Sequence, residues 1–170
     1  MKLTHKGATM KAILSTVILT LSCSIATAQT PTCRSFEATV PLQMFKDGCT
    51  SEIGLCTVGT VASSEAAING ATWKFTAHAL AESAGLPSLP KTMQSYTGSV
   101  VVTAKEGGTF TTTNAGMYDS QAGTFAQLDK IVAGTERFAD SANRWIFLSG
   151  TPRQGGGGFD SRARGEVCIH

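Results

Sequence analysis

The sequence predicts an all-β fold, namely a closed antiparallel barrel of eight up-and-down strands, with a two-sheet β-sandwich as the alternative. Threonine, valine and glycine are abundant, and apolar residues often alternate with polar ones, which is typical of half-buried strands. About eight such segments with short connections follow one another in a single domain, residues 29–170. No cysteine pair brackets a tryptophan strand as in immunoglobulin domains, which favours the barrel.

The first 28 residues have the pattern of a cleavable secretory signal peptide. A lysine-containing start precedes a mostly apolar stretch at 12–25 and the small residues Ala-Thr-Ala at 26–28. The apolar stretch is too short for a stable membrane span. Cys23 as a lipoprotein attachment site is the less favoured alternative, because Thr20 stands where an aliphatic residue is expected. We therefore expect a secreted or periplasmic protein.

The charge of the domain itself is nearly balanced. Three of the 14 basic residues lie in the leader, which leaves 11 against 12 acidic residues. No basic run with interleaved aromatic residues is present, so we expect no nucleic-acid partner. The run at 155–158 lacks the Gly-Lys-Ser/Thr of a phosphate loop, and we expect no cofactor. The domain has two histidines, His78 and His170, and no Gly-x-Ser-x-Gly, so hydrolase chemistry is not expected.

The first half of the domain is expected to contain three strands. They lie at 35–42, at 55–68 as a long or bent strand, and at 71–83. Asn69-Gly70 is a strong hairpin signal before the third, because both residues tolerate positive φ. The third strand has a strict period of two, which places its apolar residues on one face: Trp73, Phe75, Ala77 and Ala79.

The second half supplies the remaining strands, which follow a proline-containing loop at 85–91. They are expected at 93–106, 109–114, 124–134, 144–151 and from 159 to the end of the chain. Gly134 is expected to hold a positive-φ turn at the end of its strand.

The strand at 144–151 is unusual because both of its faces are apolar. Ile146 and Leu148 lie on one face, and Trp145 and Phe147 lie on the other. A barrel strand with a solvated outer face would not show this pattern. We expect a second subunit, in a homodimer or homotrimer, or alternatively a loop or terminal segment, to cover the outer face.

Four cysteines remain after the leader, and an even number in an exported chain predicts two disulfides. Of the three possible pairings we predict Cys49–Cys56, across a short loop, and Cys33–Cys168, which would join the first and last strands. A metal site is not expected, because there is no Cys-x-x-Cys and histidine is scarce.

Three segments together resemble one known family. They are "DGCTSEIGLCTVGTV", "AGMYDSQAGTFAQLDKIVAGTERFADS", and "FLSGT" with the closing "GEVC". This combination, over roughly 45–168, resembles small exported proteins with the allene oxide cyclase-like β-barrel, a fold close to the dirigent proteins. Glu136 replaces the second glycine of the family's Gly-Thr-Gly-Arg-Phe pattern, and Ser141 stands where a small glycine is usual.

The resemblance implies an eight-stranded barrel with a mostly apolar cavity that is often oligomeric. Characterised relatives steer the cyclisation or coupling of reactive hydrophobic intermediates by confinement. We therefore expect a small hydrophobic ligand and, if the protein is an enzyme, an isomerase or cyclase. The alternative is a non-catalytic interaction protein or oligomeric scaffold.

The candidate cavity residues are six aromatic side chains and one aspartate. Tyr96, Tyr118 and Asp119 are the candidate polar anchors, and no residue is assigned a catalytic role. The candidates are Trp73, Phe75, Tyr96, Phe110, Tyr118, Asp119 and Phe125. Two alternatives stay open. A small barrel also fills its interior with side chains, and Asp119 also suits a turn in which its carboxylate binds its own backbone.

Overall fold

A computed structural model describes residues 30–82 and 90–170, which form nine strands and one short 3-10 helix. The elements are β1 (Thr32–Met44), β2 (Cys56–Thr60), β3 (Ala62–Ser63), β4 (Thr72–Glu82), β5 (Met93–Thr103), β6 (Thr109–Asp119), β7 (Thr124–Gly134), η1 (Glu136–Phe138), β8 (Trp145–Pro152) and β9 (Gly158–Ile169).

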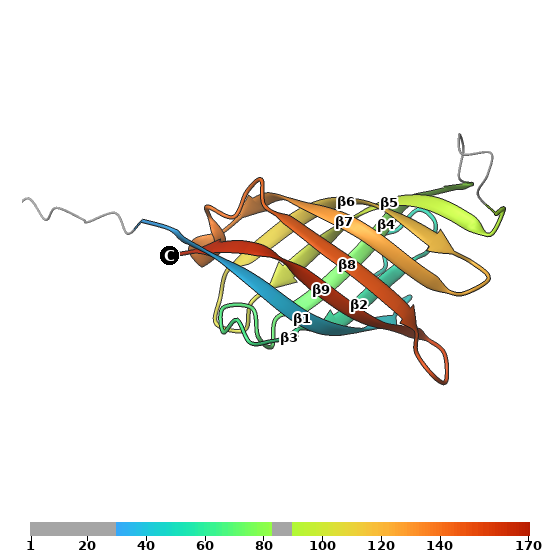
Figure 1. The fold of residues 1–170 in the computed structure, drawn as a ribbon, viewed down its shortest axis with the longest axis horizontal. Helices are drawn as coiled ribbons and strands as arrows, with labels where there is room; N and C mark the ends of the chain where they lie inside the picture. The colour runs from blue at the N-terminus through green and yellow to red at the C-terminus, as the bar shows by residue number, and fades with distance from the viewer. Residues whose placement is uncertain (1–29, 83–89) are drawn as a thin grey trace, which may run out of the picture.

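All pairings are antiparallel and belong to one sheet, which closes on itself (Figure 1). The order is β2-β4-β5-β6-β7-β8-β9-β1, and β1 pairs again with β2 through Leu42↔Gly59. The two-residue β3 pairs with Ala38 and Thr39 of β1, on the side of β1 opposite β9. The predicted eight-stranded up-and-down barrel is confirmed, with one extra short strand.

The two ends of the barrel are built differently. We call the "closed end" the one that contains η1, the start of β1 and the end of β9, and the "cavity end" the one that contains the β6–β7 and β8–β9 turns. Both predicted disulfides are present, one near each end. Cys33–Cys168 joins β1 to β9 at the closed end, and Cys49–Cys56 joins the β1–β2 connection to the start of β2 at the cavity end.

The predicted strand at 55–68 is wrong in its second part. Strand structure ends at Ser63, and the following residues form a turn closed by Val61 and Gly70. In that turn the Glu65 carboxylate accepts a hydrogen bond from the Ala67 N–H at 3.2 Å. Gly70 has φ of +77°, as the hairpin signal predicted. The loss of strand structure reflects a local carboxylate-to-backbone bond that competes with the sheet.

The strict alternation predicted for 71–83 is interrupted by a β-bulge. Trp73, Phe75 and Ala77 are buried as expected, but the register shifts at His78, between Ala77 and Ala79. The residue that pairs with Tyr96 is consequently Leu80, and Ala79 is exposed. A bulge moves every later side chain to the opposite face.

The closed end is filled by large apolar side chains. Phe138, fully buried in η1, packs edge-to-face on Phe110 with ring centroids 5.3 Å apart. Ser141 holds this segment against β9, because its hydroxyl donates to the Cys168 carbonyl at 2.8 Å and accepts from the Cys168 N–H at 3.0 Å. Trp73 lies in the same core with 1% of its surface exposed.

The positive-φ turn predicted at Gly134 is wrong. Gly134 is not among the positive-φ glycines of the described residues and is the last residue of β7. It is required by close approach instead: a Cβ there would lie 1.9 Å from the Phe138 carbonyl oxygen. The residue in a left-handed conformation is Glu136, with φ of +50°.

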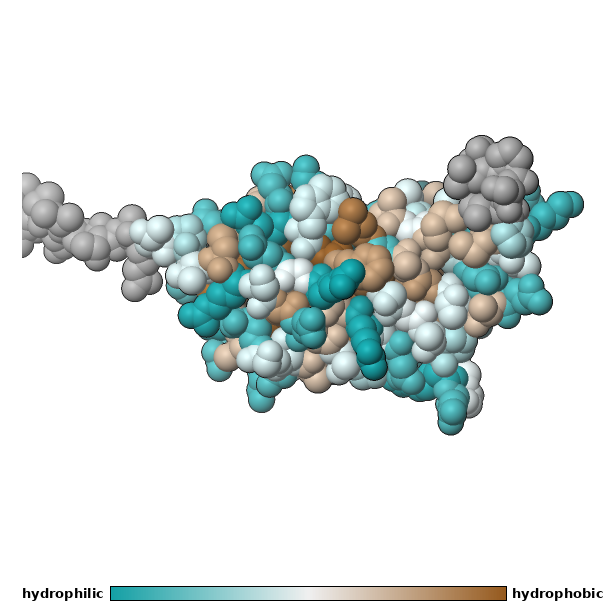
Figure 2. Space-filling model, in the orientation of Figure 1, coloured by the Kyte–Doolittle hydropathy of each residue, from teal (hydrophilic) through white to brown (hydrophobic). Residues whose placement is uncertain are grey.

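β8 has the two apolar faces that its sequence predicted. Ile146 and Leu148 are buried inside the barrel, whereas Trp145 and Phe147 are 51% and 36% exposed on the outside. Leu128 of β7 is paired with Phe147 and is 46% exposed. Figure 2 shows apolar side chains gathered over this part of the barrel, with hydrophilic ones beside them. No helix in the described part of the chain is long and apolar enough to cross a membrane.

Candidate functional site

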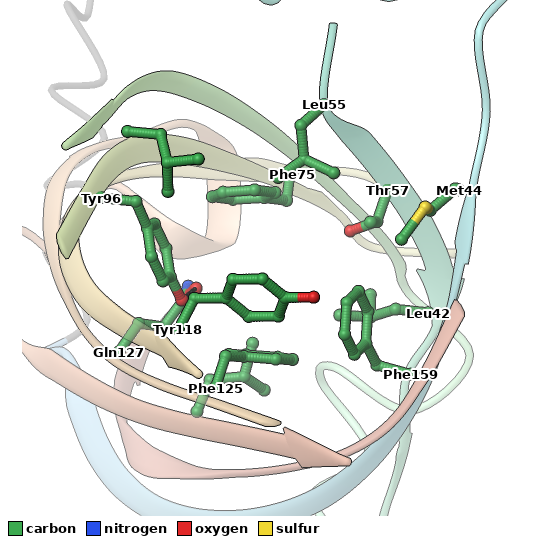
Figure 3. A pocket seen from close by; sticks show the side chains of 12 residues that line it. Leu42, Met44, Leu55, Thr57, Phe75, Tyr96, Tyr118, Phe125, Gln127 and Phe159 are labelled. Carbon is green, nitrogen blue, oxygen red and sulfur yellow. Dashed lines mark hydrogen bonds between the residues drawn. The ribbon is translucent and has the colours of Figure 1, made fainter. Parts of the chain in front are cut away.

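The candidate site is a cavity of about 130 Å³ inside the cavity end of the barrel (Figure 3). All eight barrel strands contribute at least one side chain, and Leu55 comes from the connection before β2. The lining consists of Leu42, Met44, Leu55, Thr57, Phe75, Leu80, Tyr96, Tyr118, Phe125, Gln127, Leu148 and Phe159. Met44 and Leu80 are also 46% and 41% exposed, so the cavity reaches the surface.

The structure divides the seven candidate residues into two groups. Four of them line the cavity: Phe75, Tyr96, Tyr118 and Phe125. Trp73 and Phe110 are buried in the packed core of the closed end and are not part of the lining. The seventh candidate, Asp119, is also outside the lining.

The Asp119 side chain forms hydrogen bonds within its own turn. Asp119 is the last residue of β6, and one carboxylate oxygen accepts hydrogen bonds from the backbone N–H groups of Gln121 at 2.9 Å and Ala122 at 3.3 Å. These bonds, with the Gln121 N–H as the main cause, lower the pKa of the Asp119 carboxyl. The geometry fits the turn alternative and not a ligand anchor.

The cavity is kept open at the level of Tyr96 by a glycine on the next strand. Tyr96 pairs with Gly116 of β6, and a Cβ at Gly116 would lie 2.4 Å from the Tyr96 ring. The ring of Phe75 meets that of Tyr96 edge-to-face, with centroids 6.0 Å apart. Any larger residue at position 116 would push Tyr96 into the cavity.

A buried polar network lies beneath the cavity, between it and the packed core. The Tyr96 hydroxyl donates to Gln127 Oε1 at 2.8 Å, and Gln127 Nε2 donates to Asp129 Oδ2 at 2.8 Å. The other carboxylate oxygen, Oδ1, accepts from Thr112 Oγ1 at 2.8 Å and from Asn114 Nδ2 at 3.0 Å. Asp129 is fully buried, and every bond in the chain from Tyr96 runs toward it.

Burial dominates the electrostatics of this network. Desolvation raises the pKa of the Asp129 carboxyl, although hydrogen bonds from Gln127, Thr112 and Asn114 oppose the shift. Desolvation also raises the pKa of the Tyr96 phenol, and the nearby Asp129 charge adds to it. Tyr96 therefore remains a neutral phenol whose proton is engaged by Gln127. Toward the cavity it offers only an acceptor.

One buried hydroxyl in the lining has no hydrogen-bond partner among the described residues. Thr57, 2% exposed, carries an Oγ1 that is buried and makes no hydrogen bond in the described residues. Figure 3 shows this oxygen directed into the cavity, as is the hydroxyl of Tyr118. Almost all buried polar groups in proteins are hydrogen-bonded, so an exception at a cavity wall points to a missing partner.

The potential metal ligands in the described residues come together elsewhere. Cys33, Glu166 and Cys168 lie at the closed end, but the two sulfur atoms are joined in the disulfide. The Arg144 guanidinium lies 2.9 Å from Glu166 and 3.1 Å from Cys168 Sγ. A cation beside these groups makes them a poor metal site, and the cavity is lined by no group of this kind.

Sequence reasoning identified Tyr96 and Tyr118 but missed the buried polar residues Gln127 and Asp129, for a clear reason. Along β7 the inward positions are Phe125, Gln127, Asp129 and Ile131, while Leu128 and Val132 are on the exposed outer face. The polar Gln127 and Asp129 are thus inside, while the apolar Leu128 and Val132 are outside, the reverse of the usual pattern. Phe125 could have revealed this arrangement. If Phe125 points inward, then every second residue after it, including Gln127 and Asp129, also points inward.

Comparison with known proteins adds no assignment: no family model, no curated protein and no solved structure matches the chain.

Proposed function

We propose that the protein is exported and binds a small, uncharged, apolar molecule in the barrel cavity. The observation that carries the proposal is the composition of the lining: none of its twelve residues is charged, and five are aromatic. Apolar, largely pre-formed cavities with few polar groups are the usual form of small-molecule sites.

The size of the cavity limits the ligand. An engineered apolar cavity of about 150 Å³ in another protein binds benzene, and the present cavity of about 130 Å³ is similar. A single six-membered ring with a short substituent therefore fits. At about 0.7 kcal/mol per heavy atom, a ligand of about seven heavy atoms would bind with a Kd of about 0.3 mM.

Calorimetric titration with toluene tests the proposal. The wild-type protein should bind toluene, whereas a Leu55→Trp variant, which fills the cavity from its wall, should lose binding at least tenfold. Val101→Trp is the matched control, because Val101 is 40% exposed on the outer face of β5. Absence of toluene binding to the wild type, or equal binding to both variants, would refute the proposal.

Export is supported by the disulfides, and the leader pattern in the sequence is a separate prediction. The two disulfides are compatible with an oxidising extracellular or periplasmic compartment. The proposed signal peptide, residues 1–28, lies outside the described residues. Mass determination of the mature protein tests it, with cleavage after Ala28 as the expected result and an intact leader as the contradiction.

The resemblance to allene oxide cyclase-like barrels extends the proposal to chemistry by confinement. The lining carries no charged acid or base, so a reaction in this cavity would be steered by its shape and by exclusion of water. A reactive apolar substrate would then give a different ratio of products with and without the protein. If the product ratio is unchanged for every substrate that binds, the proposed chemistry is refuted and only the proposed binding function stands.

A second candidate function, an interaction surface, is favoured by the outer face of β7 and β8. Leu128, Trp145 and Phe147 are all at least one-third exposed there. Lys130 lies over the Trp145 ring at 5.8 Å and Arg164 over the Phe147 ring at 5.1 Å, but both rings remain accessible. Sedimentation velocity should show a homo-oligomer that Phe147→Glu dissociates and Val101→Glu leaves intact. A monomer at all concentrations would contradict self-association through this face.

A further inference from the structure

We propose that Thr57 is the polar anchor of the cavity, and that the ligand is a neutral monocyclic molecule with one hydroxyl or carbonyl oxygen. This inference rests on the proposed ligand binding and adds the polar chemistry of the ligand. It is carried by the unpartnered Thr57 hydroxyl together with the absence of charge from the lining.

The position of Thr57 places its side chain among other lining residues. On β2 it is paired with Phe75 of β4 on one side and with Met44 of β1 on the other, and all three line the cavity. Residues paired across neighbouring strands project to the same face of the sheet. Thr57 is therefore held from both sides, and its hydroxyl faces the cavity interior (Figure 3).

A threonine is an unfavourable choice here unless something binds to it. Valine has nearly the same shape and would bury a methyl group where Thr57 buries an unbonded hydroxyl. Leaving a buried hydroxyl without a partner costs free energy, because its bonds to water are lost on folding. A ligand oxygen at this point would restore the missing hydrogen bond.

The other polar groups of the lining are less suited to this role. The Tyr96 hydroxyl already donates to Gln127, and Gln127 is bonded at both ends of its amide. Tyr118 also directs its hydroxyl into the cavity, but its side chain is only half-buried and water can satisfy it. Thr57 is the lining residue whose hydrogen-bonding capacity is both buried and unused.

The charge of the ligand follows from the surroundings. No lysine, arginine or histidine lines the cavity, so a carboxylate would enter without a counter-ion. A cation would lack a lining carboxylate, because Asp129 is shielded by its three side-chain partners. An uncharged oxygen is the polar group that remains.

Three ligands of one ring, namely toluene, benzyl alcohol and benzoate, separate these contributions in calorimetric titrations. They are measured with the full wild-type protein, with Thr57→Val and with Thr57→Ser. We expect Thr57→Val to weaken benzyl alcohol about five- to tenfold, the equivalent of one hydrogen bond. Toluene should change less than twofold, Thr57→Ser should keep most of the benzyl alcohol affinity, and benzoate should not bind detectably.

The outcomes distinguish this inference from the proposed function. If the wild type binds toluene but Thr57→Val binds benzyl alcohol as well as the wild type does, the anchor is refuted and the apolar cavity stands. If neither toluene nor benzyl alcohol binds, both proposals fail. Equal losses for toluene and benzyl alcohol would mean that the substitution altered the cavity shape, which also refutes the anchor.

A second readout does not depend on any ligand. With no ligand bound, Thr57→Val should raise the denaturant midpoint of unfolding, because an unbonded buried hydroxyl is replaced by a methyl group. Benzyl alcohol should raise the midpoint of the wild type more than that of Thr57→Val. A lower midpoint for unliganded Thr57→Val would show that the hydroxyl already has a partner in the folded protein and would overturn the proposal.

Discussion

The two ends of the barrel interior carry similar aromatic side chains, but one end is packed and the other contains a cavity. At the closed end, Phe138 and Phe110 interlock and leave little space. At the cavity end, Phe125 packs edge-to-face on Phe159 at 5.1 Å, but both rings border an open space. Aromatic content alone therefore does not separate a packed core from an open cavity. The two differ in whether a further segment fills the end of the barrel.

The plug is η1, which only the closed end possesses among the described residues. It brings Phe138 across the barrel end, and Gly134 provides the space for its backbone. The polar network of Asp129 then forms a floor between the two regions. The comparison predicts that changes at the closed end act on stability, and that equivalent changes at the cavity end act mainly on binding.

The two disulfides give the largest expected contrast. Cys33 and Cys168 are 135 residues apart and Cys49 and Cys56 are seven apart. In the chain-entropy model, removing them costs about 5 and about 2.5 kcal/mol respectively. Denaturant unfolding of the two double-alanine variants measures the difference. Equal losses would mean that the long-range link does not act by restricting the unfolded chain.

A matched pair of phenylalanine truncations compares the two interiors directly. Phe110→Ala, in the packed region, should lower the free energy of unfolding by about 3–5 kcal/mol, because it leaves a cavity beside Phe138. Phe125→Ala should cost less, about 1–2 kcal/mol, since its ring is half-buried beside space that already exists. Chemical denaturation of both variants measures these losses. A larger loss of unfolding free energy for Phe125→Ala would contradict the expected difference between the two ends.

Gly134→Val tests the plug itself. A side chain there would collide with the Phe138 carbonyl, and we expect a loss of about 2–3 kcal/mol in the free energy of unfolding. Ala133→Val is the control, because Ala133 is the exposed neighbour on β7 and should change stability by less than about 0.5 kcal/mol. Thermal unfolding of both measures it, and a stable Gly134→Val protein would show that η1 moves freely.

The sequence predicted the architecture better than the site, and particular residues show why. Alternation is a local signal, and it predicted most of the barrel strands. The even number of cysteines predicted two disulfides, and the long-range pair Cys33–Cys168 followed from the expectation that the first and last strands meet. The bulge at His78, which turns Leu80 into the cavity, leaves no signal in a run of apolar residues. The inverted β7, with Asp129 inside and Leu128 outside, contradicts the rule that burial follows hydropathy. Trp73 lies in the packed core and Phe75 lines the cavity, because η1 fills only one end of the barrel. The alternation of their strand does not show this difference.

Asp129 provides the last test, because the floor between the two regions contains an acid whose stability contribution depends on pH. Its pKa is raised in the folded protein above the ordinary value of 3.8, with burial as the main cause. The folded state therefore holds the proton more tightly than the unfolded state. As the pH rises from about 4 through the folded-state pKa, this residue's contribution to the free energy of unfolding should fall, and it should fall no further above that pKa.

Asp129→Asn removes this titration, so the stability of the wild type relative to the variant should decline across that pH window. Denaturant unfolding of both proteins between pH 3 and pH 8 measures the decline. A wild type that instead gains on the variant as the pH rises would show that the three donors around Asp129 outweigh its desolvation. The floor would then be an anion site that the protein stabilises, and Gln127 and Tyr96 would be oriented by a permanent charge and not by a carboxyl that can take up a proton.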